Sequence, residues 1–186
     1  VPETSPLYTQ AKYKAATISK ENNNLSEYKE ILTKLSKEQD PFDNGEKVLY
    51  ELADVIGKSS TNSYPYLRRL WMYYPNTSQA KSAVKYLSAF EKQSPKYKPT
   101  AEEWSLRAVQ LMNGWQFKQI IKELAPHVSN WKTYTPGTCK AKYAYGRSHF
   151  KINSVTKAAQ ILEPVGDNCV GIDDDSGPRS LYITGK

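Results

Sequence analysis

The sequence predicts an all-α protein, a right-handed α-solenoid of about five helical hairpins. Three observations indicate this fold class. Apolar residues recur at helical spacing along most of the chain, alternating runs flanked by hairpin turns are almost absent, and similar segments return after about 37 to 38 residues. We therefore expect residues 1–186 to form a single α-helical repeat domain.

The composition excludes several protein classes. Hydrophobic residues make up 39% of the chain and aromatic residues 12%, which is too rich for a disordered protein. No apolar run approaches the roughly 20 residues that span a bilayer, so no transmembrane segment is expected. The net charge of +7 permits an anionic polymer or an acidic protein as partner. Because the basic residues are spread along the chain, we expect no nucleic acid partner, and a solvated basic surface is the simplest interpretation.

Breaks and apolar stripes predict the first three helices. The first is expected over Tyr8–Asn22, and a run of three asparagines ends it. The second is expected over Glu27–Lys37, with Ser26 as its N-cap. An Asp-Pro-Phe-Asp-Asn-Gly turn precedes the third, whose apolar stripe runs from Val48 to Ile56 and which is expected to end at Gly57.

The segment around Pro75 predicts a helical hairpin. A fourth helix is expected from about Tyr64 to Tyr74, and Pro75 prevents its continuation. Residues 76–78 are Asn, Thr and Ser, which supply capping oxygens for a fifth helix. The small side chains of Ala80 and Ala83 then let this helix pack closely against the preceding one.

The remaining helices are predicted from an internal repeat. The segments Gln79–Leu87, Gln116–Leu124 and Ser154–Leu162 align, and each follows a break in the helical pattern. We expect the second and third to end in matching turns at Pro126 and Pro164. A unit of two helices that returns after 34 to 40 residues is typical of an α-solenoid.

The last repeat unit is the most similar to a tetratricopeptide repeat. Gly146 and Ala158 match the small residues at the closest approach of that motif's two helices, and Leu162 matches its later large apolar position. A glycine within a helix costs about 1 kcal/mol relative to alanine, so close helix packing is the expected compensation. The earlier units follow the pattern less closely.

The two cysteines predict a disulfide. Cys139 begins the first helix of the last complete hairpin and Cys169 follows the second, so the two ends meet in an antiparallel pair. A bridge would close a loop of about 30 residues and contribute roughly 3 to 4 kcal/mol. The alternative is two unrelated buried thiols. A bridge implies an oxidising, periplasmic or otherwise extracytoplasmic location.

Neither a metal site nor a catalytic centre is expected. Two cysteines are too few for a metal cluster, and His127 and His149 have no ligand spacing to them. His149 is interpreted as a helix-interface residue. Most tyrosines and the four tryptophans, Trp115 among them, are interpreted as helix-packing residues, with a groove that stacks on sugars or a peptide as the alternative for a minority of them. The pair at 102–103 is interpreted as first-turn acids of a helix, and the run at 173–175 as a solvated loop without the spacing of a calcium site. We expect no cofactor.

Four segments carry a family resemblance: LRRLWMYYPNTSQAKSA, RAVQLMNGWQFKQIIKEL, CKAKYAYGRSHFKINSVTKAAQILEPVGDNC and PRSLYITGK. From Tyr64 to Lys186 the chain resembles the N-terminal helical-repeat region of soluble lytic murein transglycosylases. The resemblance implies a periplasmic protein whose full-length form cleaves peptidoglycan glycan strands to 1,6-anhydromuramoyl ends. That family's catalytic glutamate stands in a Glu-Ser motif of a C-terminal lysozyme-like domain. Neither this dipeptide nor the family's Gly-Leu-Met-Gln segment occurs here, so no catalytic residue carries over.

Two functions follow as hypotheses. The first is a non-catalytic scaffold that positions the transglycosylase's missing C-terminal catalytic domain and contacts peptidoglycan or envelope proteins. The second is a free-standing periplasmic adaptor for protein–protein interactions. In both, this chain alone is not an enzyme. A final helix near Leu181 and Tyr182 has neither a partner helix nor a polar cap, so we expect Lys186 to be a cut end.

Four residues are candidates for a binding surface. Arg68, Arg69, Tyr143 and Arg147 place positive charge beside aromatic faces, a combination suited to sugar carboxylates. In the alternative interpretation, the arginines pair with helix C-termini or with acids on a neighbouring hairpin.

Overall fold

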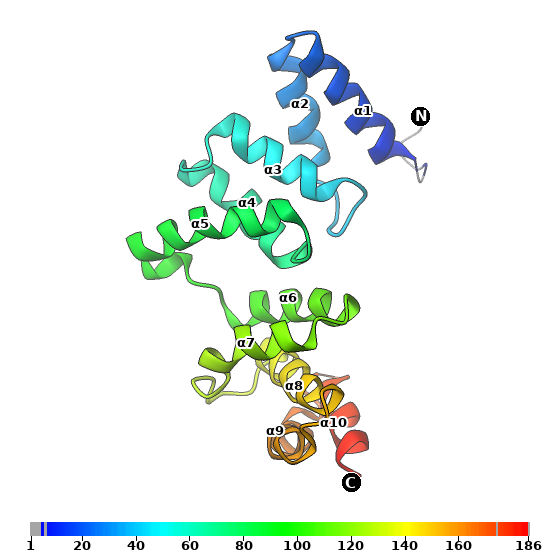
Figure 1. Cartoon of the computed structure of the whole chain (residues 1–186), viewed down its shortest axis with the longest axis vertical. Helices are drawn as coiled ribbons and strands as arrows, with labels where there is room; N and C mark the ends of the chain where they lie inside the picture. The colour runs from blue at the N-terminus through cyan, green and yellow to red at the C-terminus, as the bar shows by residue number, and fades with distance from the viewer. Residues whose placement is uncertain (1–4, 6, 174, 186) are drawn as a thin grey trace. The chain divides into compact units, whose positions relative to one another are not determined.

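The computed structural model describes residue 5, residues 7–173 and residues 175–185. Within them the chain is all-helical and contains no strand (Figure 1), which confirms the all-α part of the predicted fold class. The α-helices are α1 (Tyr8–Glu21), α2 (Leu25–Leu35), α3 (Gly45–Ile56), α4 (Tyr64–Tyr73), α5 (Ser78–Gln93), α6 (Ala101–Asn113), α7 (Phe117–Val128), α8 (Pro136–Lys151), α9 (Val155–Cys169) and α10 (Ser176–Thr184). Short 3-10 helices cover Thr61–Ser63 and Pro95–Tyr97.

The contacts divide the chain into two compact units, and the boundary between them in the sequence lies between Lys98 and Pro99. The sequence pattern gives no sign of this boundary. In the first unit, α1 packs on α2, α2 on α3, and α3 on both α4 and α5. Its core includes Leu32, Leu35 and Leu52, which are almost completely buried. Neighbouring helices in the sequence are thus neighbours in space, as a chain of helical hairpins requires.

The second unit contains α6 to α10. Helix α8 packs against α6, α7, α9 and α10, so it is the central element of this unit. Its buried face contacts two apolar clusters, one around Leu111 and Leu124 and one around Leu162 and Val165. A disulfide joins Cys139 near the start of α8 to Cys169 at the end of α9, as the sequence predicts.

Two expectations about helix ends are wrong. Helix α2 begins at Leu25, because the side chain of Asn24 accepts a hydrogen bond from the Glu27 amide and takes the role expected of Ser26. Pro126 and Pro164 lie inside α7 and α9 and do not form turns. In α9 the apolar face continues past the proline to Val165 and Cys169, both fully buried, and this packing outweighs the lost helical hydrogen bond. The side chains of Asn130 and Asn168 donate to the carbonyls of the two prolines.

Three helical hairpins have turns of the same backbone geometry. In α1–α2, α6–α7 and α8–α9, three residues connect the helices, and the middle one has left-handed backbone. The next amide donates to a carbonyl five residues earlier, which satisfies an exposed end of the first helix. The left-handed residues are Asn23, Trp115 and Asn153. The α4–α5 connection, through Pro75, contains no such residue. The repeat seen in the sequence therefore corresponds to a repeated backbone geometry in two of its three aligned segments.

Gly146 lies at a close approach of α8 and α9. A Cβ atom at this position would stand 2.6 Å from Cδ2 of Leu162, closer than two carbon atoms tolerate. The expected close packing is confirmed, and Leu162 is the residue that fills the space. Ala158, the other residue of the motif, is also buried.

We expect His149 to make the stability of the second unit depend on pH. Its side chain is buried, the Tyr145 ring meets it edge-on at 4.8 Å, and neither ring nitrogen has a hydrogen-bond partner. Burial, assisted by the charge of Lys157, lowers the pKa of His149. Its unfolded-state pKa is about 6.5. As the pH falls through this value, the unfolded chain binds the proton at a higher pH than the folded chain does. The free energy of unfolding should therefore decrease below about pH 6.5.

Urea unfolding at pH 8 and pH 5.5 tests this expectation. We expect the wild-type midpoint to be lower at pH 5.5, and His149→Phe to remove most of this difference. An equal decrease in the variant would show that other groups cause it.

Candidate functional site

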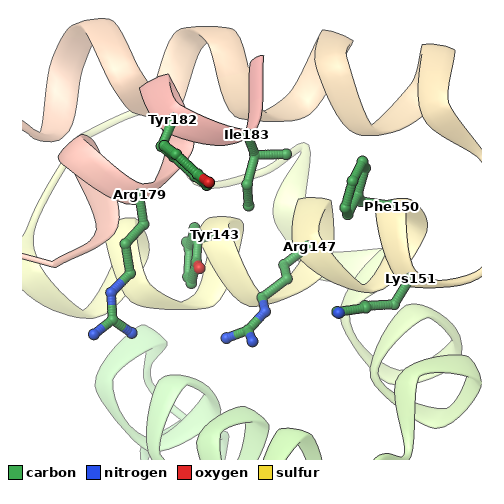
Figure 2. A pocket seen from close by; sticks show the side chains of 7 residues that line it. All are labelled: Tyr143, Arg147, Phe150, Lys151, Arg179, Tyr182 and Ile183. Atoms are coloured by element: carbon green, nitrogen blue, oxygen red, sulfur yellow. The ribbon is translucent and has the colours of Figure 1, made fainter. Parts of the chain in front are cut away.

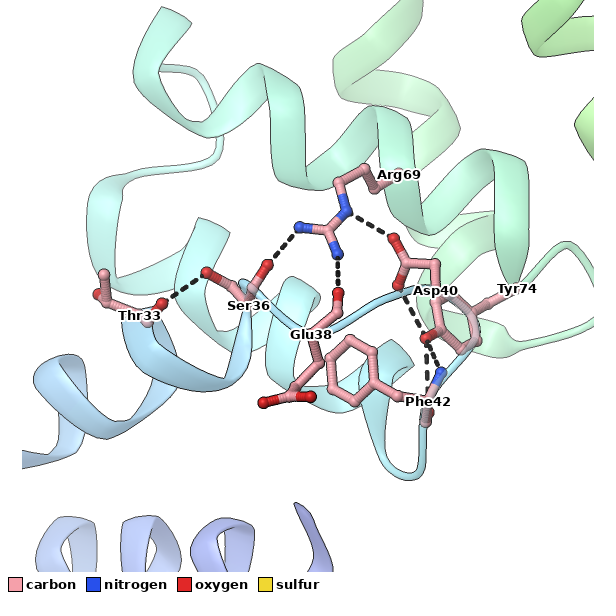
Figure 3. Close-up of polar contacts among 7 residues, drawn as sticks. All are labelled: Thr33, Ser36, Glu38, Asp40, Phe42, Arg69 and Tyr74. Atoms are coloured by element: carbon pink, nitrogen blue, oxygen red, sulfur yellow. Dashed lines mark hydrogen bonds and ion pairs between the residues drawn. The ribbon is translucent and has the colours of Figure 1, made fainter. Parts of the chain in front are cut away.

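Arg69 holds the connection between α2 and α3 (Figure 3). Its guanidinium donates to the Asp40 carboxylate at 2.5 Å, to the carbonyl of Glu38 at 3.0 Å and to the carbonyl of Ser36, the residue that caps α2. The Tyr74 hydroxyl donates to the other Asp40 oxygen at 3.0 Å. For Arg69 the structure thus shows the alternative interpretation, in which the arginine pairs with an acid and a helix C-terminus.

Arg68 is also used internally. It is 3% exposed, and it donates to the hydroxyl of Tyr64 at 2.9 Å and to the carbonyl of Tyr97. Its guanidinium lies over the rings of Tyr64 and Trp71, and Glu91 is within ion-pair distance. A buried guanidinium with these partners joins the end of α5 to α4 and offers little to a ligand.

Tyr143 and Arg147 lie in a different environment, in the second unit. Both line a cavity of about 320 Å³ between α8 and α10. Figure 2 shows the charged ends of Arg147, Lys151 and Arg179 pointing to the same side of this cavity. The structure therefore separates the four sequence candidates into two internal arginines and two residues that line a cavity.

A second cavity of about 400 Å³ shares its three cations with the first. Together the two form what we term the basic groove, defined by Arg147, Lys151 and Arg179 at its centre, Trp115 at one side and Tyr182 at the other. All five residues belong to the second unit. Trp115 is 74% exposed and Tyr182 is 87% exposed, so two large aromatic faces stand in solvent beside three cations. This combination suits an anionic ligand with apolar parts.

The groove contains three cations and one acid, Asp175, which lines its second cavity. Among the described residues, no acid lies within ion-pair distance of Arg147 or Lys151. Arg179 pairs with Asp175 at 3.2 Å, but both side chains are more than half exposed, and such surface pairs contribute little. The guanidinium of Arg147 lies 6.0 Å from the centre of the Tyr143 ring, which orients it along α8.

The acids singled out in the sequence have structural roles. Glu103 forms a capping box with Thr100 at the start of α6, as expected for first-turn acids. Asp173 does not lie in a solvated loop: it is 7% exposed, accepts a hydrogen bond from the Ser176 amide at the start of α10, and pairs with Lys140. Burial alone would raise the pKa of Asp173, but these partners together hold it below its usual value. Asp174 is outside the described residues.

Sequence reasoning missed Lys151 and Arg179, and it favoured a helix-packing role for Trp115 over the groove-lining alternative. The spacing of Arg147 and Lys151, one helical turn apart, was a signal that both lie on one face of α8. Arg179 joins them only because α10 packs on α8. For Trp115 no pattern indicated an exposed aromatic residue with left-handed backbone.

Comparison with protein-family models, with curated proteins and with solved structures finds no match to the chain. Within the described residues, no helix is long and apolar enough to cross a membrane. In the same part of the chain, no three His, Cys, Asp or Glu side chains are grouped so that they could hold a metal ion.

Trp115 is expected to lower the free energy of unfolding relative to a glycine at the same position. Its φ of 57° is unfavourable for a bulky residue, and its ring contacts Phe117 only edge-on at 5.8 Å. Because glycine adopts this backbone freely, we expect Trp115→Gly to raise the free energy of unfolding by up to about 1 kcal/mol. Asn153→Gly, in the equivalent turn, should change it less, since asparagine tolerates this conformation. Chemical denaturation of both variants measures the difference, and a clear loss of stability in Trp115→Gly would contradict it.

Proposed function

We propose that the chain is the non-catalytic scaffold of a periplasmic peptidoglycan lytic transglycosylase. In this proposal its hairpins form a right-handed solenoid of tetratricopeptide-like units, which positions a C-terminal catalytic domain and contacts cell-wall glycan or partner proteins. The proposal rests on the resemblance of four segments to that family. These segments cover most of α4, α8, α9 and α10, but only parts of α5, α6 and α7.

The observation that carries a scaffold role is the repeated hairpin turn. Equivalent turns in α6–α7 and α8–α9 give successive hairpins the same local exit geometry, as repeat scaffolds require. The disulfide between Cys139 and Cys169 favours a location outside reducing compartments. The basic groove is lined by cations and exposed aromatic residues, an arrangement suited to binding an anionic surface.

Two measurements test the proposal. The first is the sequence of the native gene beyond the codon for Lys186, where the proposal expects a lysozyme-like domain with a Glu-Ser motif. A stop codon there would favour the alternative, a free-standing periplasmic adaptor. The second is incubation of the purified chain with isolated sacculi, from which we expect no release of soluble muropeptides. Release of anhydromuropeptides by this chain alone would overturn the non-catalytic role.

A further inference from the structure

We propose that the basic groove binds an extended acidic segment of a partner protein. Two carboxylates of the segment pair with the cations of the groove, and an apolar side chain between them enters the cavity beside α10. The inference rests on the proposed scaffold function in one respect, that this function includes partner proteins.

Charge is the first argument. Arg147 and Lys151 have no acidic partner among the described residues, and the exposed pair of Arg179 with Asp175 is readily exchanged for a ligand carboxylate. Three cations on one side of a concave surface attract an anionic chain and speed its association. The groove thus provides charge for at least two carboxylates.

Spacing is the second argument. Arg147 and Lys151 are four residues apart on α8, which places them about 6 Å apart along the helix. In an extended peptide, alternate side chains on the same side are about 6.6 Å apart. Acids at alternate positions of an extended segment therefore match the two cations, whereas adjacent acids point to opposite sides.

The third argument is that one wall of the cavity is apolar. In an extended segment, the residue between two acids points away from the cations. Figure 2 shows Ile183 and Phe150 on the side of the cavity away from the charged ends of Arg147, Lys151 and Arg179. An apolar side chain at the intermediate position is buried there, while Trp115 and Phe117 line the adjoining cavity. The groove therefore selects the pattern acid–apolar–acid.

Cations beside exposed aromatic rings also suit single-stranded nucleic acid. The disulfide argues against that ligand, because bridges of this kind are typical of proteins outside the compartments that hold nucleic acid. A carboxylated glycan satisfies the charge, but it provides no alternation of acidic and apolar groups. An extended protein segment places its acids against the cations of the groove and an apolar side chain against Ile183 and Phe150.

Isothermal titration calorimetry with three capped peptides tests the proposal on the purified, oxidised chain. The first peptide contains Gly-Glu-Leu-Glu-Phe-Gly, the second has glutamine in place of both glutamates, and the third has the two glutamates adjacent. At 50 mM salt we expect the first peptide to bind, the third at least tenfold more weakly, and the second not measurably. Binding of the first should weaken clearly at 300 mM salt, since it depends on charge.

Variants assign the binding to the groove. The double variant Arg147→Gln/Lys151→Gln should weaken the first peptide at least tenfold. Trp115→Gly should weaken it severalfold without loss of stability. Lys122→Gln, an exposed charge on α7 that does not line the groove, is the matched control and should leave the affinity unchanged. Helical circular dichroism and the thermal midpoint of each variant show that it is folded.

Equal affinity of the folded double variant for the first peptide would overturn the proposal. Tighter binding of polygalacturonate or of a thymidine oligonucleotide than of the peptide, lost in the same double variant, would also overturn it and reassign the groove to a glycan or to nucleic acid. These outcomes are independent of the gene sequence beyond the codon for Lys186, so failure of the peptide proposal and failure of the scaffold proposal are distinguishable.

Discussion

Arg69→Met is expected to lower the free energy of unfolding of the first unit by about 3 kcal/mol. The substitution leaves the Asp40 carboxylate, which is 3% exposed, without its cation, and it leaves two carbonyls at the end of α2 without a donor. Loss of one partner of a buried ion pair typically costs about 3 to 5 kcal/mol. We expect the lower end of this range because a quarter of the Arg69 side chain is exposed to water.

A double-mutant cycle with Asp40→Asn measures the interaction energy between Arg69 and Asp40 apart from their other contacts. Because the double variant no longer buries an unpaired charge, its loss should be smaller than the sum of the two single losses by more than about 1 kcal/mol. Arg69→Lys should recover only part of the stability, since a single ammonium group cannot reproduce the planar fork that reaches three acceptors. Lys34→Met breaks a solvent-exposed pair with Glu30 and serves as the control, with no measurable change expected. Simple additivity in the cycle would contradict this account of Arg69.

Removal of the disulfide is expected to have a similarly large effect on the second unit. Cys139 and Cys169 are 30 residues apart, and a bridge across a loop of this length contributes about 3 to 4 kcal/mol by restricting the unfolded chain. The free energy of unfolding of the double variant Cys139→Ala/Cys169→Ala should be lower by this amount. The effect should extend to α10, which follows Cys169 closely and packs on both α8 and α9.

Hydrogen exchange measures where the loss occurs. Amides of α10 and of the ends of α8 and α9 should exchange faster in the double variant, and amides of the first unit should be unchanged. Since Arg179 and Tyr182 are on α10, the groove should lose affinity for the acidic peptide as well. Treatment of the wild type with a reductant should reproduce these effects, and the same treatment of the double variant should have none. Unchanged protection of α10 after reduction would show that its packing alone positions it.

The sequence predicts the helices well because their signals are local. Thr100 and Thr77 cap α6 and α5, and the apolar stripes end where the helices end to within a few residues. The disulfide was also predictable, because the ends of an antiparallel hairpin must meet. The prolines at 126 and 164 were misleading, since a local penalty was outweighed by packing further along the helix.

The candidate site was only partly predictable, for two physical reasons. Arg68 and Arg69 resemble surface cations in the sequence, and only the tertiary structure shows that the α2–α3 connection and Tyr97 take up their hydrogen bonds. Arg179 approaches Arg147 through the packing of α10 on α8, which no local pattern encodes. Trp115 was interpreted as a packing residue because no local pattern indicates that this position has left-handed backbone and leaves its ring exposed.

The turn between α6 and α7 also has an evolutionary consequence. Three hairpins use the same left-handed position, and two of them place asparagine there, which the backbone tolerates. Because this backbone is unfavourable for a bulky residue, the proposed binding role of the groove predicts that a tryptophan is retained here only while its exposed ring contacts a ligand. In descendants that no longer use the groove, position 115 should change to asparagine or glycine while the other two turns stay as they are. The identity of this residue would then report, lineage by lineage, whether the groove is still under selection.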